Sequence, residues 1–114
     1  MDDSSFFPGV ITSLPPADIP IDGLSSYLVQ GKDSQIIFMS FEKEAVVGVH
    51  THAAQWCVVL DGQIELTVDG QKRVYGKGET YFIPANVPHG AKIFAGYKDV
   101  TLFGQKDRYK ERTI

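Results

Sequence analysis

The stretch GVHTHAAQWCVVLDG, residues 48–62, contains two of the chain's three histidines, His50 and His52, and Gln55 follows them closely. It ends in apolar and β-branched residues and the dipeptide Asp61-Gly62. On a β-strand, residues two apart point to the same side, so both imidazoles would lie in one patch. Two neighbouring imidazoles suit adjacent positions around a metal ion. The stretch therefore predicts a metal-binding strand in a β-sheet protein.

Turn signals and alternating patterns continue beyond this stretch. Asp61-Gly62 and Asp69-Gly70 each stand between alternating runs, and Asp-Gly readily adopts a type I′ turn, so two hairpins in series are predicted. Strands are predicted at 24–30, 35–42, 46–52, 55–60, 63–68, 72–75, 80–83, 89–94 and 100–103. Many short strands in an all-β chain must close into a barrel or stack as two sheets.

The two ends of the chain differ from this strand-rich centre. Residues 1–23 hold four of the six prolines and predict an irregular arm with short extended pieces, such as Gly9 to Ser13. Residues 24–104 form the predicted barrel. Residues 105–114 are charged and lack an apolar stripe, which predicts a solvated end or a short closing turn. The chain length of 114 residues fits one domain.

Composition and charge exclude several classes of protein. The chain has 11 basic and 14 acidic residues and a net charge of −3, so we expect no nucleic-acid partner. Its one cysteine, Cys57, excludes an intramolecular disulfide framework and fits a reducing compartment. The sequence shows neither a signal peptide nor the roughly 18 apolar residues of a membrane span. We therefore expect a soluble, cytoplasmic protein with no membrane partner.

The third histidine, His89, lies in the stretch PANVPHG. Pro84 and Pro88 stiffen a turn there, which would deliver the imidazole to the start of another strand. One interpretation is that the paired histidines are solvated and that His89 only ends a loop. Because the chain has no histidine outside this pattern, we favour the hypothesis that all three bind one metal ion.

The same region resembles the cupin superfamily, whose small β-barrels carry a metal site. The first cupin motif has a glycine, a His-x-His pair, a glutamate and, seven residues later, another glycine. His50 and His52 match the pair, and Gln55 stands seven residues before Gly62, at the glutamate position. The resemblance implies that these side chains and His89 are the metal ligands.

The second cupin motif is a glycine, five residues, and then Pro-x-Gly-x-x-His. Gly78, Pro84 and His89 match it, and Asn86 replaces the middle glycine with a residue that tolerates positive φ. The resemblance implies an antiparallel jelly-roll barrel, also called a double-stranded β-helix.

Gln55 differs from the family's glutamate in charge. Its amide oxygen could bind the metal directly, bond a metal-bound water, or only approach the site. A neutral ligand leaves the full +2 charge on the ion, which should lower metal affinity but increase the pull on a bound oxygen. Three histidines with one oxygen ligand suit zinc, nickel, copper, iron or manganese.

Four other residues are candidates for the wall of the barrel cavity. Cys57 has the same strand parity as Gln55, and a nearby cation would favour its thiolate; a small buried core residue is the alternative. Tyr81 could bring a hydroxyl group to the cavity, and Met39 and Phe41 could form an apolar wall. For these three, ordinary core packing is the alternative.

Two functions follow from these expectations. The first is a metal-dependent enzyme that acts on a small organic molecule in the barrel; the cupin resemblance extends this to a dioxygenase, an isomerase or a lyase. The second is a non-catalytic cupin that binds a small ligand. A barrel in which the metal is only structural is a weaker third interpretation. No serine is paired with a base, so a serine-triad hydrolase is not favoured.

The apolar residues of the arm predict a homodimer. Phe6, Phe7, Val10 and Ile11 are too apolar for a free tail, and a neighbouring subunit is one place to bury them. The alternative is that the arm folds back over its own barrel.

Overall fold

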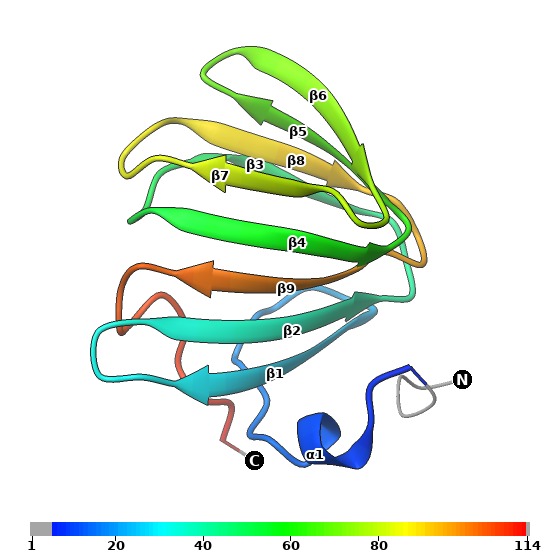
Figure 1. Cartoon of the computed structure of the whole chain (residues 1–114), viewed down its shortest axis with the longest axis vertical. Coiled ribbons are helices and arrows are strands. Elements are labelled where there is room, and N and C mark those ends of the chain that lie inside the picture. Colours follow the sequence, from blue (N-terminus) through cyan, green and yellow to red (C-terminus); the bar gives the residue numbers. More distant parts are fainter. Residues whose placement is uncertain (1–5, 114) are drawn as a thin grey trace.

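The computed structural model describes residues 6–113 and confirms an all-β jelly roll of two antiparallel sheets (Figure 1). The larger sheet has the order β1-β2-β9-β4-β7 and the smaller one β3-β8-β5-β6. The strands are β1 (Leu24–Gln30), β2 (Gln35–Phe41), β3 (Ala45–His50), β4 (Gln55–Asp61), β5 (Gln63–Val68), β6 (Gln71–Gly76), β7 (Thr80–Ile83), β8 (His89–Ile93) and β9 (Lys98–Phe103). Among the described residues, no helix is long and apolar enough to cross a membrane.

Strands such as β4 and β5 were predictable because they bury alternate residues. Cys57 and Val59 of β4 are buried while Trp56 is exposed, and Ile64 and Leu66 of β5 are buried between polar neighbours. This alternation places one apolar face of each sheet against the other. The core between the sheets is also where the candidate site lies.

One of the two predicted hairpins is present. Asp69 and Gly70 have φ angles of 49° and 79°, both positive as a type I′ turn requires, and they join β5 to β6. The hairpin predicted at Asp61-Gly62 is wrong, because β4 and β5 belong to different sheets. Gly62 instead carries the chain between the sheets at a φ of 73°, and a Cβ there would lie 2.7 Å from the Tyr97 Cα.

The arm folds over its own barrel, and its extended piece at Gly9 to Ser13 is a wrong prediction. These residues form the single-turn helix α1 (Gly9–Thr12), started by the carbonyl of Pro8, which accepts from the amides of Ile11 and Thr12. A helix of one turn has no room for the 3.6-residue pattern that would reveal it. Phe7 is buried, with ring centroids 6.0 Å from Tyr27 and 5.8 Å from Phe38.

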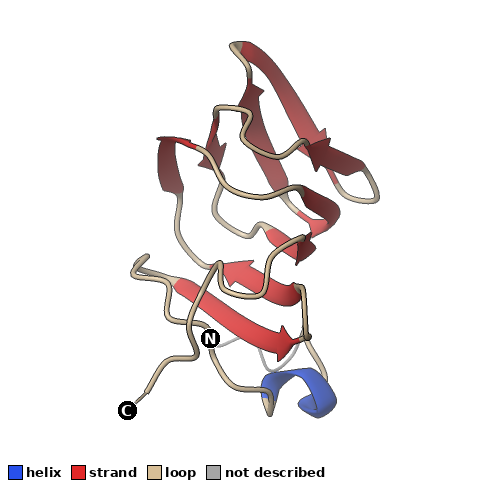
Figure 2. Cartoon of the chain, turned by 90° about the vertical axis from the view of Figure 1, so that its left-hand side faces the viewer, coloured by secondary structure: helices blue, strands red, loops and turns tan. Residues whose placement is uncertain are grey.

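The C-terminal segment packs against this arm at one end of the molecule (Figure 1, Figure 2). The Asp18 amide donates to the Lys110 carbonyl at 2.7 Å, and the side chain of the buried Gln35 donates to the Tyr109 carbonyl at 2.7 Å. These bonds hold Tyr109 against Gln35 of β2 and Lys110 against the arm.

Candidate metal centre

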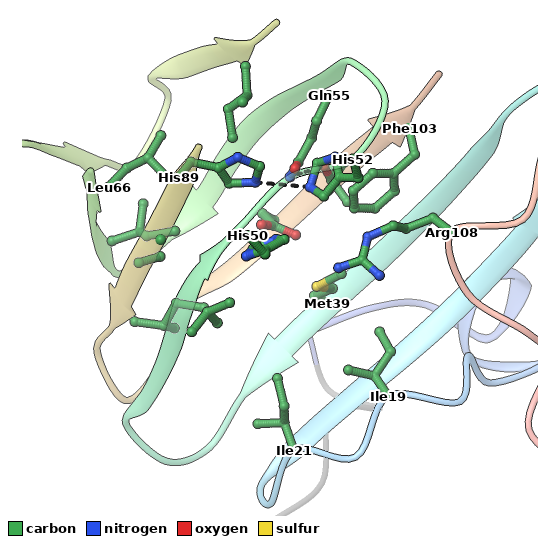
Figure 3. Close-up of a pocket in the computed structure, with 18 of the residues that line it drawn as sticks. Ile19, Ile21, Met39, His50, His52, Gln55, Leu66, His89, Phe103 and Arg108 are labelled. Atoms are coloured by element: carbon green, nitrogen blue, oxygen red, sulfur yellow. Dashed lines mark hydrogen bonds between the residues drawn. The ribbon is translucent and has the colours of Figure 1, made fainter. Parts of the chain in front are cut away.

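Three histidines meet where β3 and β8 pair. His50 lies opposite His89 in this antiparallel pair, after a register shift between Val47 and His50. The predicted strand 46–52 ends early, at His50, so His52 lies in the following loop. Even so, the ring centroids are 4.3–5.1 Å apart, and one nitrogen from each histidine lies within 4.8 Å of the others. Figure 3 shows the three rings gathered at one side of a pocket.

Backbone carbonyls fix which nitrogen of each ring faces the centre. The Nδ1 contacts are His50 to Gly48 O at 2.8 Å, His52 to Ala53 O at 2.6 Å and His89 to Val87 O at 2.9 Å. A carbonyl oxygen can only accept, so each Nδ1 carries a proton and donates. Each neutral ring therefore keeps a lone pair on Nε2, the form in which imidazole binds a metal.

The closest contact between the rings supports a cation at their centre. The Nε2 atoms of His52 and His89 are 2.9 Å apart (Figure 3). With both protons on Nδ1, two lone pairs face each other and no hydrogen joins them. Metal–nitrogen bonds of about 2.0–2.1 Å would place two ligand nitrogens about 2.9 Å apart at a right angle and about 3.3 Å apart at a tetrahedral angle, so the observed spacing lies near what a shared ion requires. The three histidines therefore have the donor atoms and spacing to bind a divalent transition metal.

Burial favours the neutral form of His52 and His89. It lowers the pKa of His52 to about 4 and also lowers the pKa of His89, and the charge of Arg108 acts in the same direction on both. A neutral imidazole at physiological pH can bind a metal without first losing a proton.

Gln55 lines the same pocket and is oriented by a neighbouring strand. Its Nε2 donates to Thr101 Oγ1 at 3.0 Å, and Thr101 donates in turn to the Trp56 carbonyl at 3.3 Å. Because the nitrogen is bound to Thr101, the amide oxygen is the Gln55 atom that can face a cation or its water. In Figure 3 the amide points toward the histidines.

The pocket has mostly apolar walls. Met39, Phe41 and Tyr81 are among its lining residues, together with aliphatic side chains from both sheets such as Leu66 and Ile83. Tyr81 is buried, and burial raises the pKa of its hydroxyl group well above the usual value. Apolar walls of this kind strengthen electrostatic interactions inside a pocket.

The structure corrects the placement of Cys57. Cys57 lies on the same face of β4 as Gln55, so its side chain does point inward. The thiol is buried beside the pocket wall, where Sγ donates to Asp99 Oδ2 at 3.3 Å. Burial, reinforced by the charge of Asp99, raises the pKa of the thiol far above its ordinary range. Cys57 is therefore a neutral hydrogen-bond donor to Asp99, and the predicted thiolate is not favoured.

Sequence reasoning missed two charged residues that line the pocket, Asp99 and Arg108. Arg108 reaches in from the C-terminal segment, with its guanidinium 4.3 Å from the Tyr109 ring centroid and 5.9 Å from that of Phe103 (Figure 3). Its buried Nε has no hydrogen-bond partner among the described residues. For Asp99 the available signal was its even spacing with Thr101 and Phe103, which puts all three on one face of β9.

Comparisons with solved structures agree with this architecture. An RmlC-like cupin from Shewanella frigidimarina is 26% identical, with a TM-score of 0.71 over 84% of this chain and 87% of that one. KdgF from a Halomonas species is 21% identical, with a TM-score of 0.68 over 80% of this chain and 87% of its own. A Bacillus subtilis oxalate decarboxylase is 17% identical, with a TM-score of 0.68, and matches 84% of this chain over 29% of its own length.

The sequence comparisons identify the family. No curated protein sequence matches the chain significantly. The cupin domain profile, however, matches residues 37–103, more than half of the chain, and includes all three histidines. The chain therefore belongs to the cupin family.

Proposed function

We propose that this cupin is a metal-dependent enzyme that acts on a small anionic organic molecule in its barrel. His50, His52 and His89 would bind one divalent transition metal, and the Gln55 oxygen would bind it directly or through one water. The observation that carries the proposal is the 2.9 Å contact between the Nε2 atoms of His52 and His89, where two lone pairs need a cation. A related fold is known with manganese, in the Mn(II) centres of the Bacillus subtilis oxalate decarboxylase.

The bound metal would act as a Lewis acid or redox centre toward a substrate oxygen. The protein contributes the environment of that reaction. Gln55 adds no negative charge, so the ion keeps its full attraction for an oxygen ligand. The aliphatic and aromatic walls exclude water from the reacting groups.

Arg108 supports an anionic substrate. Its buried Nε lacks a partner among the described residues, and its charge acts on His52 and His89, at the metal end of the pocket. A guanidinium binds carboxylates well because its planar N–H groups match their geometry. A carboxylate between the ion and Arg108 would satisfy both positive groups.

Metal analysis and a substrate screen together test this function. Protein purified without added metal should contain close to one equivalent of a transition metal, measured by mass spectrometry. When the metal-loaded protein is incubated with pools of small carboxylic acids, NMR should show at least one acid consumed, and His50→Ala should abolish its turnover. A metal-loaded protein that binds an acid without converting it would favour the non-catalytic cupin, and a protein with no affinity for transition metals would contradict the proposal.

A further inference from the structure

Asp99 is a buried carboxylate that the metal centre does not use. It lies on β9 with its side chain among the pocket-lining groups, and the residue is 4% exposed. It is the one carboxylate among the described residues that line the pocket. Lone carboxylates are rarely buried in apolar walls unless something compensates their charge.

The two oxygens of Asp99 have different surroundings. Oδ2 accepts from the Tyr97 hydroxyl at 2.6 Å and from Cys57 Sγ at 3.3 Å. Oδ1 is buried and has no hydrogen-bond partner among the described residues. Burial raises the pKa of Asp99 to about 6, so the group is ionised at neutral pH. An unpaired buried carboxylate oxygen is costly, and a donor on a bound ligand would remove that cost.

The spacing along β9 limits the size of this ligand. Three residues face inward in turn: Phe103 contacts the His52 ring at 5.3 Å, Thr101 binds Gln55, and Asp99 follows. Each step is about 6.6 Å, so Asp99 lies a few atoms deeper than the level of Gln55. The cavity volume is about 80 Å³. This is well below the roughly 300–1,000 Å³ of pockets that take drug-sized ligands, so the ligand must be small.

Charge balance decides the chemistry at each end. The metal and Arg108 together are more positive than Asp99 is negative, so a carboxylate suits the metal end and an additional ammonium would worsen the balance. A hydroxyl group donates a hydrogen bond without adding charge. We propose that the ligand is a small hydroxy acid whose hydroxyl donates to Asp99 Oδ1 while its carboxylate faces the metal and Arg108. This inference rests on the proposed metal centre.

Matched acids test the inference with the zinc-loaded protein and calorimetry. The probes are butyrate, 3-hydroxybutyrate and 4-hydroxybutyrate, which differ only in the hydroxyl group. At least one hydroxylated acid should bind about ten-fold more tightly than butyrate, as expected for a hydrogen bond to a charged acceptor. This preference should shrink in Asp99→Asn, which keeps a neutral acceptor, and vanish in Asp99→Leu. Butyrate itself should bind all three proteins alike. Asp61→Asn, at an exposed carboxylate of β4, should behave as wild type.

Each outcome of the binding experiment either supports or overturns the hydroxyl contact to Asp99. Equal binding of all three acids to the wild type, or an unchanged preference in a folded Asp99→Leu protein, would overturn the inference. So would a protein that holds zinc but binds none of the acids, and that result would leave the metal centre standing. Zinc content, measured first, separates the failure of the metal centre from the failure of the hydroxyl contact. If Asp99→Leu does not fold, Asp99→Asn supplies the comparison: it must reduce the preference.

A second feature is independent of the pocket. One row of apolar side chains crosses the outer face of the larger sheet, because its members are register neighbours on β1, β2, β9, β4 and β7: Val29, Ile36, Leu102, Trp56 and Phe82. Phe82 is 58% exposed and Trp56 is 44% exposed. Within the described part of the arm, residues 6–23, Phe7 packs one row away, on Phe38.

The geometry points to a second copy of this chain as the occupant. Five strands spaced about 4.8 Å apart and about six residues long make a face of roughly 24 by 20 Å. Its corrugated surface approaches the roughly 600–800 Å² per partner that a stable interface buries. A two-fold axis through this uncharged row would pair it with itself. The dimer contact expected of the arm would then lie on the sheet.

Trp56 is the chain's one tryptophan, so its fluorescence reports on this face. Its emission should shift to longer wavelength on dilution, at the same concentrations at which light scattering shows dimers separating. Phe82→Glu should give monomers with red-shifted Trp56 emission. The matched control is Val74→Glu, because Val74 is 48% exposed on the smaller sheet, and this variant should stay dimeric. A monomeric wild type at 100 μM, or a dimer that survives Phe82→Glu, would overturn the proposal.

Discussion

Both ends of the cavity present acceptor atoms without donors. The histidine end favours a metal cation, whereas the Asp99 end favours a hydrogen-bond donor. At the histidine end, three Nδ1–H groups point away to backbone carbonyls, and neutral Nε2 lone pairs crowd together at 2.9 Å. At the other end, Tyr97 and Cys57 donate to one oxygen of an anionic Asp99 and leave the second oxygen bare. Crowded neutral lone pairs favour a cation, whereas a buried anion beside apolar walls favours a donor. The backbone and core hydrogen bonds at each end thus determine what kind of group completes it.

The largest expected effect comes from removing a ligand at the histidine end. His50→Ala should lower the affinity for zinc by more than 100-fold, since one of three converging lone pairs is lost. Circular dichroism should show the fold retained, because the core between the sheets does not include the ion. Thr51→Ala, at an exposed position between the paired histidines, is the control and should keep wild-type affinity. Complete unfolding when the wild type is treated with a chelator would contradict this account.

The next effect tests the charge at the Asp99 end. Its folded pKa is about 6 against an ordinary 3.8, so between about pH 4 and 6 the folded state binds more protons than the unfolded state. Asp99 therefore makes the free energy of unfolding fall as pH rises through that window. The lowered pKa of His52 acts oppositely, but it does so equally in wild type and Asp99→Asn.

The difference in the free energy of unfolding between wild type and Asp99→Asn reports on the titration of Asp99 alone. From pH 4 to 6, Asp99→Asn should gain about 2 kcal/mol in stability relative to wild type, out of about 3 kcal/mol for the whole titration at 1.36 kcal/mol per pKa unit. Urea unfolding of the metal-free proteins at several pH values measures this difference. A difference that does not change with pH would show that Asp99 is not a strained anion.

A smaller effect should come from the residue that orients Gln55. Thr101→Val removes the acceptor of the Gln55 amide nitrogen, so the amide is free to rotate. We expect about a ten-fold loss in metal affinity, the lower end of what such supporting contacts contribute. Competition with a chromogenic chelator measures it, with Thr67→Val on β5 as the control. Unchanged affinity would mean that the Gln55 oxygen takes no part in binding the metal.

The sequence predicted those parts of the molecule that depend on local patterns. Alternation located every strand to within two residues, and motif spacing identified three histidines that the fold brings together. Local patterns could not reveal that Asp61-Gly62 leads between sheets, because that depends on the close approach of Gly62 to the Tyr97 backbone.

The missed residues of the pocket depend on tertiary contacts. Arg108 belongs to a charged segment without an apolar stripe, and it reaches the pocket because the buried Gln35 binds the backbone of Tyr109. Asp99 lies just before the predicted strand 100–103, which in fact begins at Lys98. An aspartate at a strand start ordinarily indicates a turn, and only the pairing of β9 with β2 and β4 turns it inward.

X-ray absorption spectroscopy of the zinc-loaded protein tests the central claim most directly. We expect three imidazole nitrogens at about 2.0–2.1 Å, visible by their outer-shell scattering, with the remaining positions filled by oxygen. In His50→Ala the imidazole number should fall to two. A sulfur ligand, or a wild-type spectrum with fewer than three imidazoles, would contradict the account, because the histidine lone pairs would then not share one ion.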